Sequence, residues 1–313
     1  MTINKDWATF RLQGTGTAII NWGDGTPSET ATLSSDSYIE YHHDYTEHAI
    51  YTVTITGDNV TDLIFDYSVL AALDVSKNPV LKYLYCTSNE LTELDVSKNT
   101  ALTWLNCRNN QLTTLDVSNN TALERLYCGE NQLTALDVSK NVALIELLCE
   151  KNQLTALDIS KNPALIELHC PENQLTALNV SKNTILEKLN CYENQLTALD
   201  VSENTELIGL DCHTNRLTTL DMSNNTALKF LTCHYNRLTA LDMSHNGELR
   251  SLNCSGNRLT ADELNNTFKT LHNNTISKKD QTIIYKRIYI GNNPGTSACS
   301  WSNAKRKDWD VYK

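Results

Sequence analysis

The chain has ten cysteines, and their spacing decides which chemistry they could carry. Nine of them recur every 21 residues, from Cys86 to Cys254, and only Cys299 stands outside the series. A zinc site would need cysteines about two to four residues apart, and the sequence holds no such pair. Cysteines stacked at a constant interval would point the same way into a core, which disfavours disulfides. We therefore predict buried thiols that fill a small apolar position.

Two groups of histidines and acids are the next candidates, because both residue types bind metal ions. One group lies before the repeats and the other within them: His42, His43, Asp44 and His48, and Asp211, His213 and His234. We rank a metal site below a structural role in the first group and below partner binding in the second. We expect no metal ion and no other cofactor.

Alignment on the cysteines gives a unit of 21 residues, Leu-x-x-Leu-x-Cys-x-x-Asn-x-Leu-Thr-x-Leu-Asp-Val-Ser-x-Asn-x-x. A single coil would expose apolar residues at both ends, whereas stacked coils bury a continuous strip of Leu, Cys and Val. The two Asn positions can satisfy buried loop backbone, because an amide side chain both donates and accepts hydrogen bonds. We expect a local hydrogen bond at the Asp position, although a column of carboxylates could also attract cations.

This unit resembles the 21-residue class of bacterial leucine-rich repeats called IRREKO. The Leu-Asp-Val-Ser-x-Asn segment with in-phase cysteines is similar to surface proteins of Bacteroidetes. The resemblance covers residues 70–260. It implies a leucine-rich-repeat solenoid, with a parallel β-sheet of nine 21-residue coils, and an internalin-like binding module that is secreted or attached to the cell surface.

Residues 1–66 precede the repeat and predict a β-rich cap over the first coil. The Asp24-Gly25 step between apolar segments is a strong hairpin signal. Residues 22–26 together with residues 51–55 resemble the polycystic-kidney-disease (PKD) type of β domain. The segment is shorter than a full member, so we expect an abbreviated PKD-like cap.

The period ends after Leu259, and residues 261–313 predict an α/β cap. A capping box begins at Thr260, and apolar residues follow at helical spacing. We expect a strand over residues 283–290 and a short helix over residues 301–307. The predicted chain thus has three parts, which are a cap over residues 1–66, a solenoid over residues 67–260 and a cap over residues 261–313.

Composition and motifs exclude several classes of function. A net charge of −11 repels nucleic-acid phosphates, and no apolar run approaches the about eighteen residues of a membrane span. The sequence lacks Gly-x-Ser-x-Gly, a phosphate-binding glycine loop and His-Glu-x-x-His. Residues 297–301 only faintly resemble a cysteine-protease nucleophile. We therefore predict no enzymatic activity, no nucleic-acid partner and no membrane span.

Binding is expected where the repeat varies. Strand side chains alternate, so the residues on either side of the second Leu, and the residue after the Cys, point outward. Aromatic and cationic residues gather at these positions in the first three coils, and acidic residues follow. The predicted ligand-binding residues are Tyr83, Tyr85, Trp104, Arg108, Arg125, Tyr127, Glu146 and Glu167.

These residue types dominate binding hot spots, so the sequence favours a module that recognises a protein or a glycan. The alternative is a structural spacer or stalk with no specific ligand. The start of the chain lacks the order of a secretory signal, which fits either a cytosolic protein or a mature form. From the resemblance we expect a monomer that acts outside the cell or at its surface.

Overall fold

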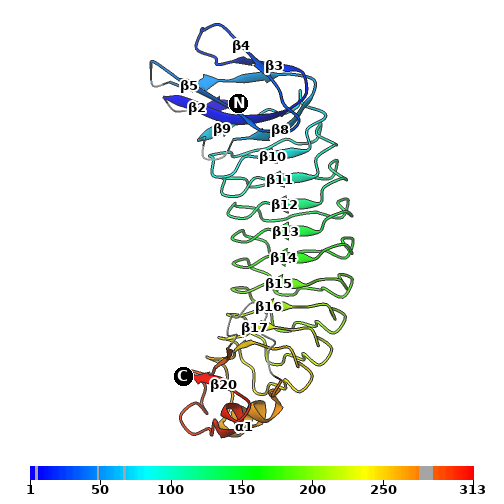
Figure 1. Cartoon of the computed structure of the whole chain (residues 1–313), viewed down its shortest axis with the longest axis vertical. Coiled ribbons are helices and arrows are strands. Elements are labelled where there is room, and N and C mark those ends of the chain that lie inside the picture. The colour runs from blue at the N-terminus through cyan, green and yellow to red at the C-terminus, as the bar shows by residue number, and fades with distance from the viewer. Residues whose placement is uncertain (4–5, 48, 66–67, 275–284) are drawn as a thin grey trace. The chain divides into compact units, whose positions relative to one another are not determined.

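The computed structural model describes residues 1–3, 6–47, 49–65, 68–274 and 285–313. The chain divides into two compact units, which we call the N-terminal unit (Met1–Leu154) and the C-terminal unit (Thr155–Lys313). In each unit, successive coils contribute one short strand to a parallel ladder (Figure 1). The predicted solenoid is confirmed.

The ladder of the N-terminal unit pairs strands from consecutive coils in register. Its members are β8 (Val60–Ile64), β10 (Tyr83–Tyr85), β11 (Trp104–Asn106), β12 (Arg125–Tyr127) and β13 (Glu146–Leu148). In β12 the central Leu126 is fully buried, while Arg125 and Tyr127 on either side of it face outward. This alternation follows from the two-residue period of a strand.

A β-rich cap precedes this ladder, as predicted. Its other strands are β1 (Thr2–Ile3), β2 (Trp7–Gly14), β3 (Thr17–Asn21), β4 (Glu29–Thr32), β5 (Ile39–Asp44), β6 (Tyr51–Thr52), β7 (Thr54–Thr56) and β9 (Leu70–Ala72). The predicted hairpin is β3–β4, which are antiparallel. In its turn Gly23 has φ 82°, and a Cβ there would lie 2.4 Å from the carbonyl oxygen of Thr52, so only glycine fits.

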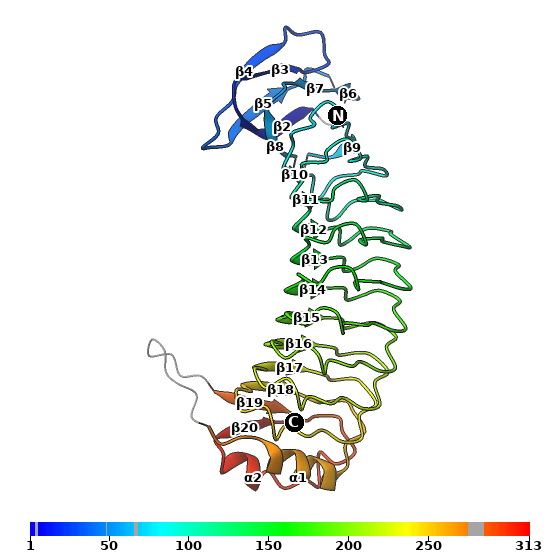
Figure 2. The same ribbon diagram turned by 90° about the vertical axis from the view of Figure 1, so that its right-hand side faces the viewer.

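The C-terminal unit continues the same kind of ladder and ends in a helical layer (Figure 2). Its strands are β14 (Glu167–His169), β15 (Lys188–Asn190), β16 (Gly209–Asp211), β17 (Phe230–Thr232), β18 (Ser251–Asn253), β19 (Lys286–Tyr289) and β20 (Trp309–Tyr312). Strands β19 and β20 add to the nine predicted coils, as β8 does in the other unit. The expected strand over residues 283–290 appears as β19, and residues 283–284 lie outside the described part.

The helices of this cap form where the sequence predicts them. Helix α1 (Ala261–Thr270) begins after Thr260, whose Oγ1 accepts a hydrogen bond from the Glu263 amide at 3.3 Å. Its Leu264 and Phe268 are fully buried, and a short helix α2 (Ser302–Lys305) lies beside it. No helix in the described ranges is long and apolar enough to cross a membrane.

The cysteines occupy the core position that the repeat predicts. All nine in-phase cysteines are fully buried, and Cys299 is nearly so. Burial in apolar surroundings raises the pKa of Cys107 and of Cys170 to about 12. These thiols therefore behave as small apolar groups rather than as nucleophiles.

The Asn that follows each Cys holds two coils together. The Nδ2 of Asn131 donates to the carbonyl oxygens of Cys107, Cys128 and Gly129 at 3.0, 3.1 and 3.1 Å. Its Oδ1 accepts from the amide of Leu112 at 3.0 Å. One buried amide thus satisfies its own coil and the preceding one, which the sequence predicts.

The second Asn position is less completely satisfied. The Nδ2 of Asn120 donates to the carbonyl oxygens of Val96 and Asn99 at 2.9 and 2.8 Å. Its Oδ1 is buried and finds no donor within the described ranges. The two Asn columns therefore differ in energetic role, although the sequence repeats them equally.

The Asp position makes the local hydrogen bond that we expected. The Oδ1 of Asp116 accepts from the amide of Ser118 at 2.9 Å, and Asn179 does the same for Ser181 at 3.0 Å. Hydrogen bonds from Ser118 hold the pKa of Asp116 below its usual value.

Candidate functional site

The outward positions of neighbouring strands stand side by side. Tyr83 pairs with Trp104, and Trp104 pairs with Arg125. Parallel strands lie about 4.8 Å apart, so residues 21 apart in the sequence become direct neighbours on this face. The variable residues of each coil therefore form one continuous surface within each unit.

An aromatic cluster covers the first coils of the N-terminal unit. It consists of Tyr83, Tyr85, Trp104, Arg125 and Tyr127. The Trp104 ring centroid lies 6.3, 5.4 and 5.6 Å from the rings of Tyr83, Tyr85 and Tyr127. The Arg125 guanidinium carbon sits over the Trp104 ring, 4.9 Å from its centroid. All five side chains are half-buried. The structure thus brings together five of the eight predicted site residues.

Two further features of this cluster concern its polar groups. The Nε1 of Trp104 is buried and has no hydrogen-bond acceptor in the described part of the chain. The Tyr127 hydroxyl donates to Glu146, whose Oε2 also lies 3.4 Å from the Nε of Arg125. Glu146, also predicted, therefore borders the cluster and orients Tyr127 and Arg125.

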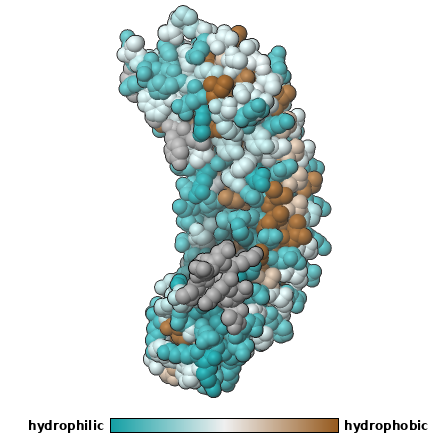
Figure 3. All heavy atoms as spheres, viewed as in Figure 1, coloured by the Kyte–Doolittle hydropathy of each residue, from teal (hydrophilic) through white to brown (hydrophobic). Residues whose placement is uncertain are grey.

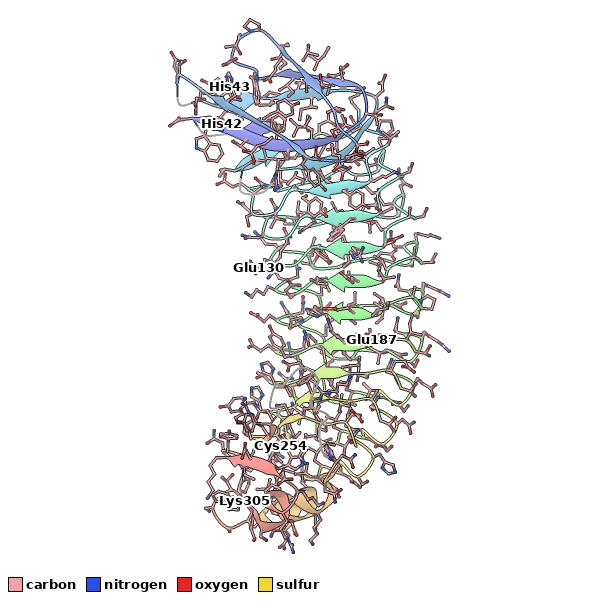
Figure 4. All side chains as sticks on the ribbon, in the orientation of Figure 1. His42, His43, Glu130, Glu187, Cys254 and Lys305 are labelled. Carbon is pink, nitrogen blue, oxygen red and sulfur yellow. The ribbon has the colours of Figure 1, made fainter. Side chains whose placement is uncertain are left out.

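Arg108 lies at the edge of the same face, where it forms a charge network. One of its terminal nitrogens lies 2.8 Å from Oε1 of Glu130 and 3.1 Å from Oε1 of Glu150. The ammonium of Lys151 is 3.5 Å from the same oxygen of Glu130. Figure 4 shows Glu130 in the loops beyond the strand ends. Arg108 was among the predicted ligand-binding residues, and Glu150, the residue after Cys149, was expected to face outward. Glu130 was not predicted, because it lies outside the alternating strand positions.

Glu167, the remaining predicted residue, belongs to the C-terminal unit. Its carboxylate oxygens lie 2.8 Å from Nε2 of His169 and 2.9 Å from the ammonium of Lys188. These partners come from the same and the next strand. Glu167 thus forms part of a separate group of paired charges.

A histidine stack occupies later coils of the C-terminal unit. The His213 ring is parallel to the rings of Tyr192 and His234, at 4.4 and 4.2 Å between centroids. The Nδ1 of His213 lies 2.6 Å from an oxygen of Asp211. Burial, and then the nearby His213, lower the pKa of His234. Parallel rings do not converge on a common point, so this group is poorly arranged to chelate a metal ion.

The histidines of the N-terminal cap also have structural partners. The Nε2 of His43 lies 2.7 Å from Asp24, and its ring stacks on Trp22 at 4.8 Å. The Nε2 of His42 lies 3.1 Å from Asp44, whereas His48 lies outside the described residues. Among the described residues, no three His, Cys, Asp or Glu side chains form a group that could hold a metal ion.

Two other surface features are a cleft and a hydrophobic patch. A cleft of about 650 Å³ in the N-terminal unit is lined by Asp74, Asp95 and Asp116 among others, which are constant positions of the repeat. Figure 3 shows a hydrophobic patch on the surface, and in the C-terminal unit Ile166 and Ile185 are exposed before their strands begin. The cleft is also lined by Met1, Thr2 and Thr52, and none of these residues belongs to the variable outward face.

Comparison with known families matches residues 100–141 to the family described as leucine rich repeats (2 copies). The functional domain of InlJ from Listeria monocytogenes is 35% identical to this chain, with a TM-score of 0.71, and its structure includes a cysteine ladder. The match covers 81% of this chain and 53% of that chain. The chain is a leucine-rich-repeat protein.

Other solved structures are similar to this leucine-rich-repeat protein in fold alone. The internalin InlF from Listeria monocytogenes is 19% identical with a TM-score of 0.60, and the match covers 81% of this chain and 86% of that one. YopM from Yersinia enterocolitica is 24% identical with a TM-score of 0.53, over 77% of this chain and 48% of that one. No curated protein matches the sequence. The similar structures thus include internalin-like bacterial proteins, and the chain spans about half of the InlJ domain.

The caps of this leucine-rich-repeat protein extend the outward face with residues that the sequence analysis missed. In β8, Asp62 stands beside Tyr83, and Tyr38 donates a hydrogen bond to Asp62 at 3.2 Å. In the C-terminal unit, Arg287 and Tyr289 of β19 continue the columns of β18. A signal for β8 was present, because Leu63 and Phe65 lie 21 residues before a Leu and a Cys of the first coil.

Proposed function

We propose that this chain is a non-enzymatic binding module that holds a protein partner against the outward face of its N-terminal unit. The observation that carries this proposal is the aromatic cluster, which gathers one Trp, three Tyr and one Arg at positions that the repeat leaves free. Trp, Tyr and Arg are the residues most enriched among binding hot spots. Half-buried rings on a rigid sheet lose little conformational entropy when a partner covers them.

The arrangement of the rings favours a protein over a glycan. A sugar ring stacks on an open aromatic face, whereas the guanidinium of Arg125 lies over the Trp104 ring. Tyr85 in the preceding coil and Tyr127 in the following coil flank the same ring. The Trp104 ring is therefore covered rather than open, and its mixed aromatic and charged surroundings suit the surface of a protein.

A location outside the cell or at its surface belongs to the same proposal. It is supported by the resemblance to surface proteins and by the similarity to InlJ. We also propose a monomer of the IRREKO class from Bacteroidetes. The division into a PKD-like cap over residues 1–66, a solenoid over residues 67–260 and a cap over residues 261–313 likewise remains a prediction.

The test is to screen the intact chain against a displayed peptide library and a glycan array. The selected ligand is then measured on the Trp104→Ala, Tyr127→Ala double variant. Binding should weaken by about 2 kcal/mol or more, since the change removes two central aromatic side chains. The control is Phe230→Ala, which removes a half-exposed ring from an equivalent outward position in the C-terminal unit.

Unchanged binding by the double variant would refute the proposed site. If only glycans are selected, the proposed protein partner is refuted, but the outward face of the N-terminal unit remains the proposed binding surface. A melting temperature within a few degrees of the wild type is required for either conclusion, because it shows that the variant has folded.

A spacer is the second candidate function. The observation in its favour is that many outward charges already pair with each other, as Arg125 does with Glu146 and Lys188 does with Glu167. Such a surface needs no partner to satisfy its charges. If neither library yields a ligand, this second candidate becomes the better account.

A further inference from the structure

We propose that Glu150 determines the specificity of the outward face of the N-terminal unit, by binding a basic side chain, Lys or Arg, of a protein partner. This inference rests on the proposed function and names the chemistry of the partner. Glu150 lies at an outward position, two residues after β13, and no repeat position requires an acid there.

A glycine in the preceding coil makes room for Glu150. A Cβ built on Gly129 would lie 2.4 Å from the Cδ of Glu150 and 2.5 Å from its Oε1. The carboxylate therefore rests over the backbone of Gly129 and reaches back to Arg108, 3.1 Å away. Any other residue at this position would push the Glu150 carboxylate away.

The carboxylate of Glu150 is buried but only half satisfied. Its side chain is 10% exposed, and its Oε2 finds no hydrogen-bond donor within the described ranges. A buried carboxylate oxygen without a donor is costly, because it has lost water without gaining a partner. This oxygen is therefore the acceptor on the face that gains most from a donor supplied by a partner.

Arg108 divides its charge between two acids. The other cation of the network, Lys151, is paired with Glu130 rather than with Glu150. The terminal nitrogen of Arg108 is closer to Glu130, at 2.8 Å, than to Glu150, at 3.1 Å. A second cation beside Glu150 would complete the pairing. The overall charge of −11 attracts basic partners over longer distances and so favours a Lys or Arg in that role.

A partner must reach the carboxylate from solvent. The Glu150 side chain remains 10% exposed, which leaves an approach from the outward face. The site also adjoins the aromatic cluster, since Tyr127 lies two residues before Gly129 on the same side of the chain. A basic residue could thus reach Glu150 while neighbouring residues of the partner cover the rings.

The test uses peptides selected from a random displayed library on the intact chain. Their dissociation constants are measured for the wild type, for Glu150→Gln and for Gly129→Ala, and the exposed Glu93→Gln is the matched control. The selected peptides should contain a Lys or Arg whose replacement by Gln weakens binding at least tenfold. Glu150→Gln should cost as much, and the two changes together should cost little more than either alone.

Gly129→Ala should also weaken binding, because it displaces the Glu150 carboxylate. Peptides without a required basic residue, or equal binding by wild type and Glu150→Gln, would overturn the role of Glu150. If the Trp104→Ala, Tyr127→Ala variant still loses binding in that case, the proposed function stands and only this inference fails. If that variant also binds normally, both fail.

Discussion

Alternate residues of one strand in this protein have different roles, because one set packs in the core and the other forms the outward face. In β12, Leu126 is fully buried between the leucines of neighbouring coils, and the same residue type recurs at every such position. Arg125 and Tyr127 on either side face outward and change from coil to coil. We call these two sets the frame positions and the outward positions. Adjacent residues can therefore serve stability and recognition separately, since an outward residue can change without altering the packing of its frame neighbour.

The largest effect should come from a frame position. Leu126→Ala should lower the free energy of unfolding by about 2–5 kcal/mol, because it leaves a cavity in a close-packed core. Tyr127→Ala on the same strand should lower it by about 1 kcal/mol or less. Denaturant unfolding of both variants measures the difference. Equal losses would show that the outward residues also belong to the folding core.

The next largest effect should separate the two Asn columns. Asn131→Ala removes four hydrogen bonds, one of which satisfies the buried amide of Leu112, whereas Asn120→Ala removes two hydrogen bonds whose carbonyl oxygens each keep a backbone donor. We expect losses of about 3 and about 1.5 kcal/mol in the free energy of unfolding, since each buried hydrogen bond contributes about 1 kcal/mol and an unsatisfied buried amide is costly. A larger loss for Asn120→Ala, measured in the same denaturant series, would contradict this ranking.

The sequence predicts the frame positions well because the repeat shows them nine times. Each Leu, Cys and Asn must meet the same surroundings in every coil, so their burial and hydrogen bonds follow from the period. The period does not predict the burial of Glu150. That burial depends on Gly129, and only one coil of the nine has a glycine directly after its Cys. Strand β20 was missed for a similar reason, because it carries no repeat.

The outward site was predicted in part. Alternation predicted that the aromatic residues face outward, and Tyr83, Tyr85 and Tyr127 meet at Trp104. The charge network of Arg108 was not predictable, because Glu130 sits in the left-handed turn after the strand, with φ 53°, rather than at an alternating position. Charged side chains that reach across coils depend on rotamers that a repeat pattern does not encode.

Burial at the frame positions also predicts how reactive the cysteine thiols are. Since burial raises the pKa of thiols such as Cys107, native protein should react slowly with a thiol reagent at neutral pH. In denaturant without reductant all ten should react. Four or fewer reactive thiols would mean that disulfides had formed within the frame.

The smallest effect should appear at acidic pH. Hydrogen bonds from the following Ser lower the pKa of Asp95, Asp116 and Asp221 below 3.8 in the folded state. Their stabilisation is therefore present above the unfolded pKa and is lost as the pH falls through the folded one. The melting temperature should drop below about pH 4, and less steeply in Asp116→Asn, which keeps the acceptor without the charge. An equal drop of the melting temperature in the wild type and in Asp116→Asn would show that Asp116 does not contribute to the loss of stability in acid.

The most direct test of the central claim is hydroxyl-radical footprinting of the intact chain with and without a selected protein ligand. The account predicts that the ligand lowers the oxidation rate of Trp104 and Tyr127 several-fold. Phe230 and Tyr235, which are exposed in the C-terminal unit, should be oxidised at unchanged rates. Protection of Phe230 and Tyr235 with no change at Trp104 would contradict the claim that the outward face of the N-terminal unit holds the partner.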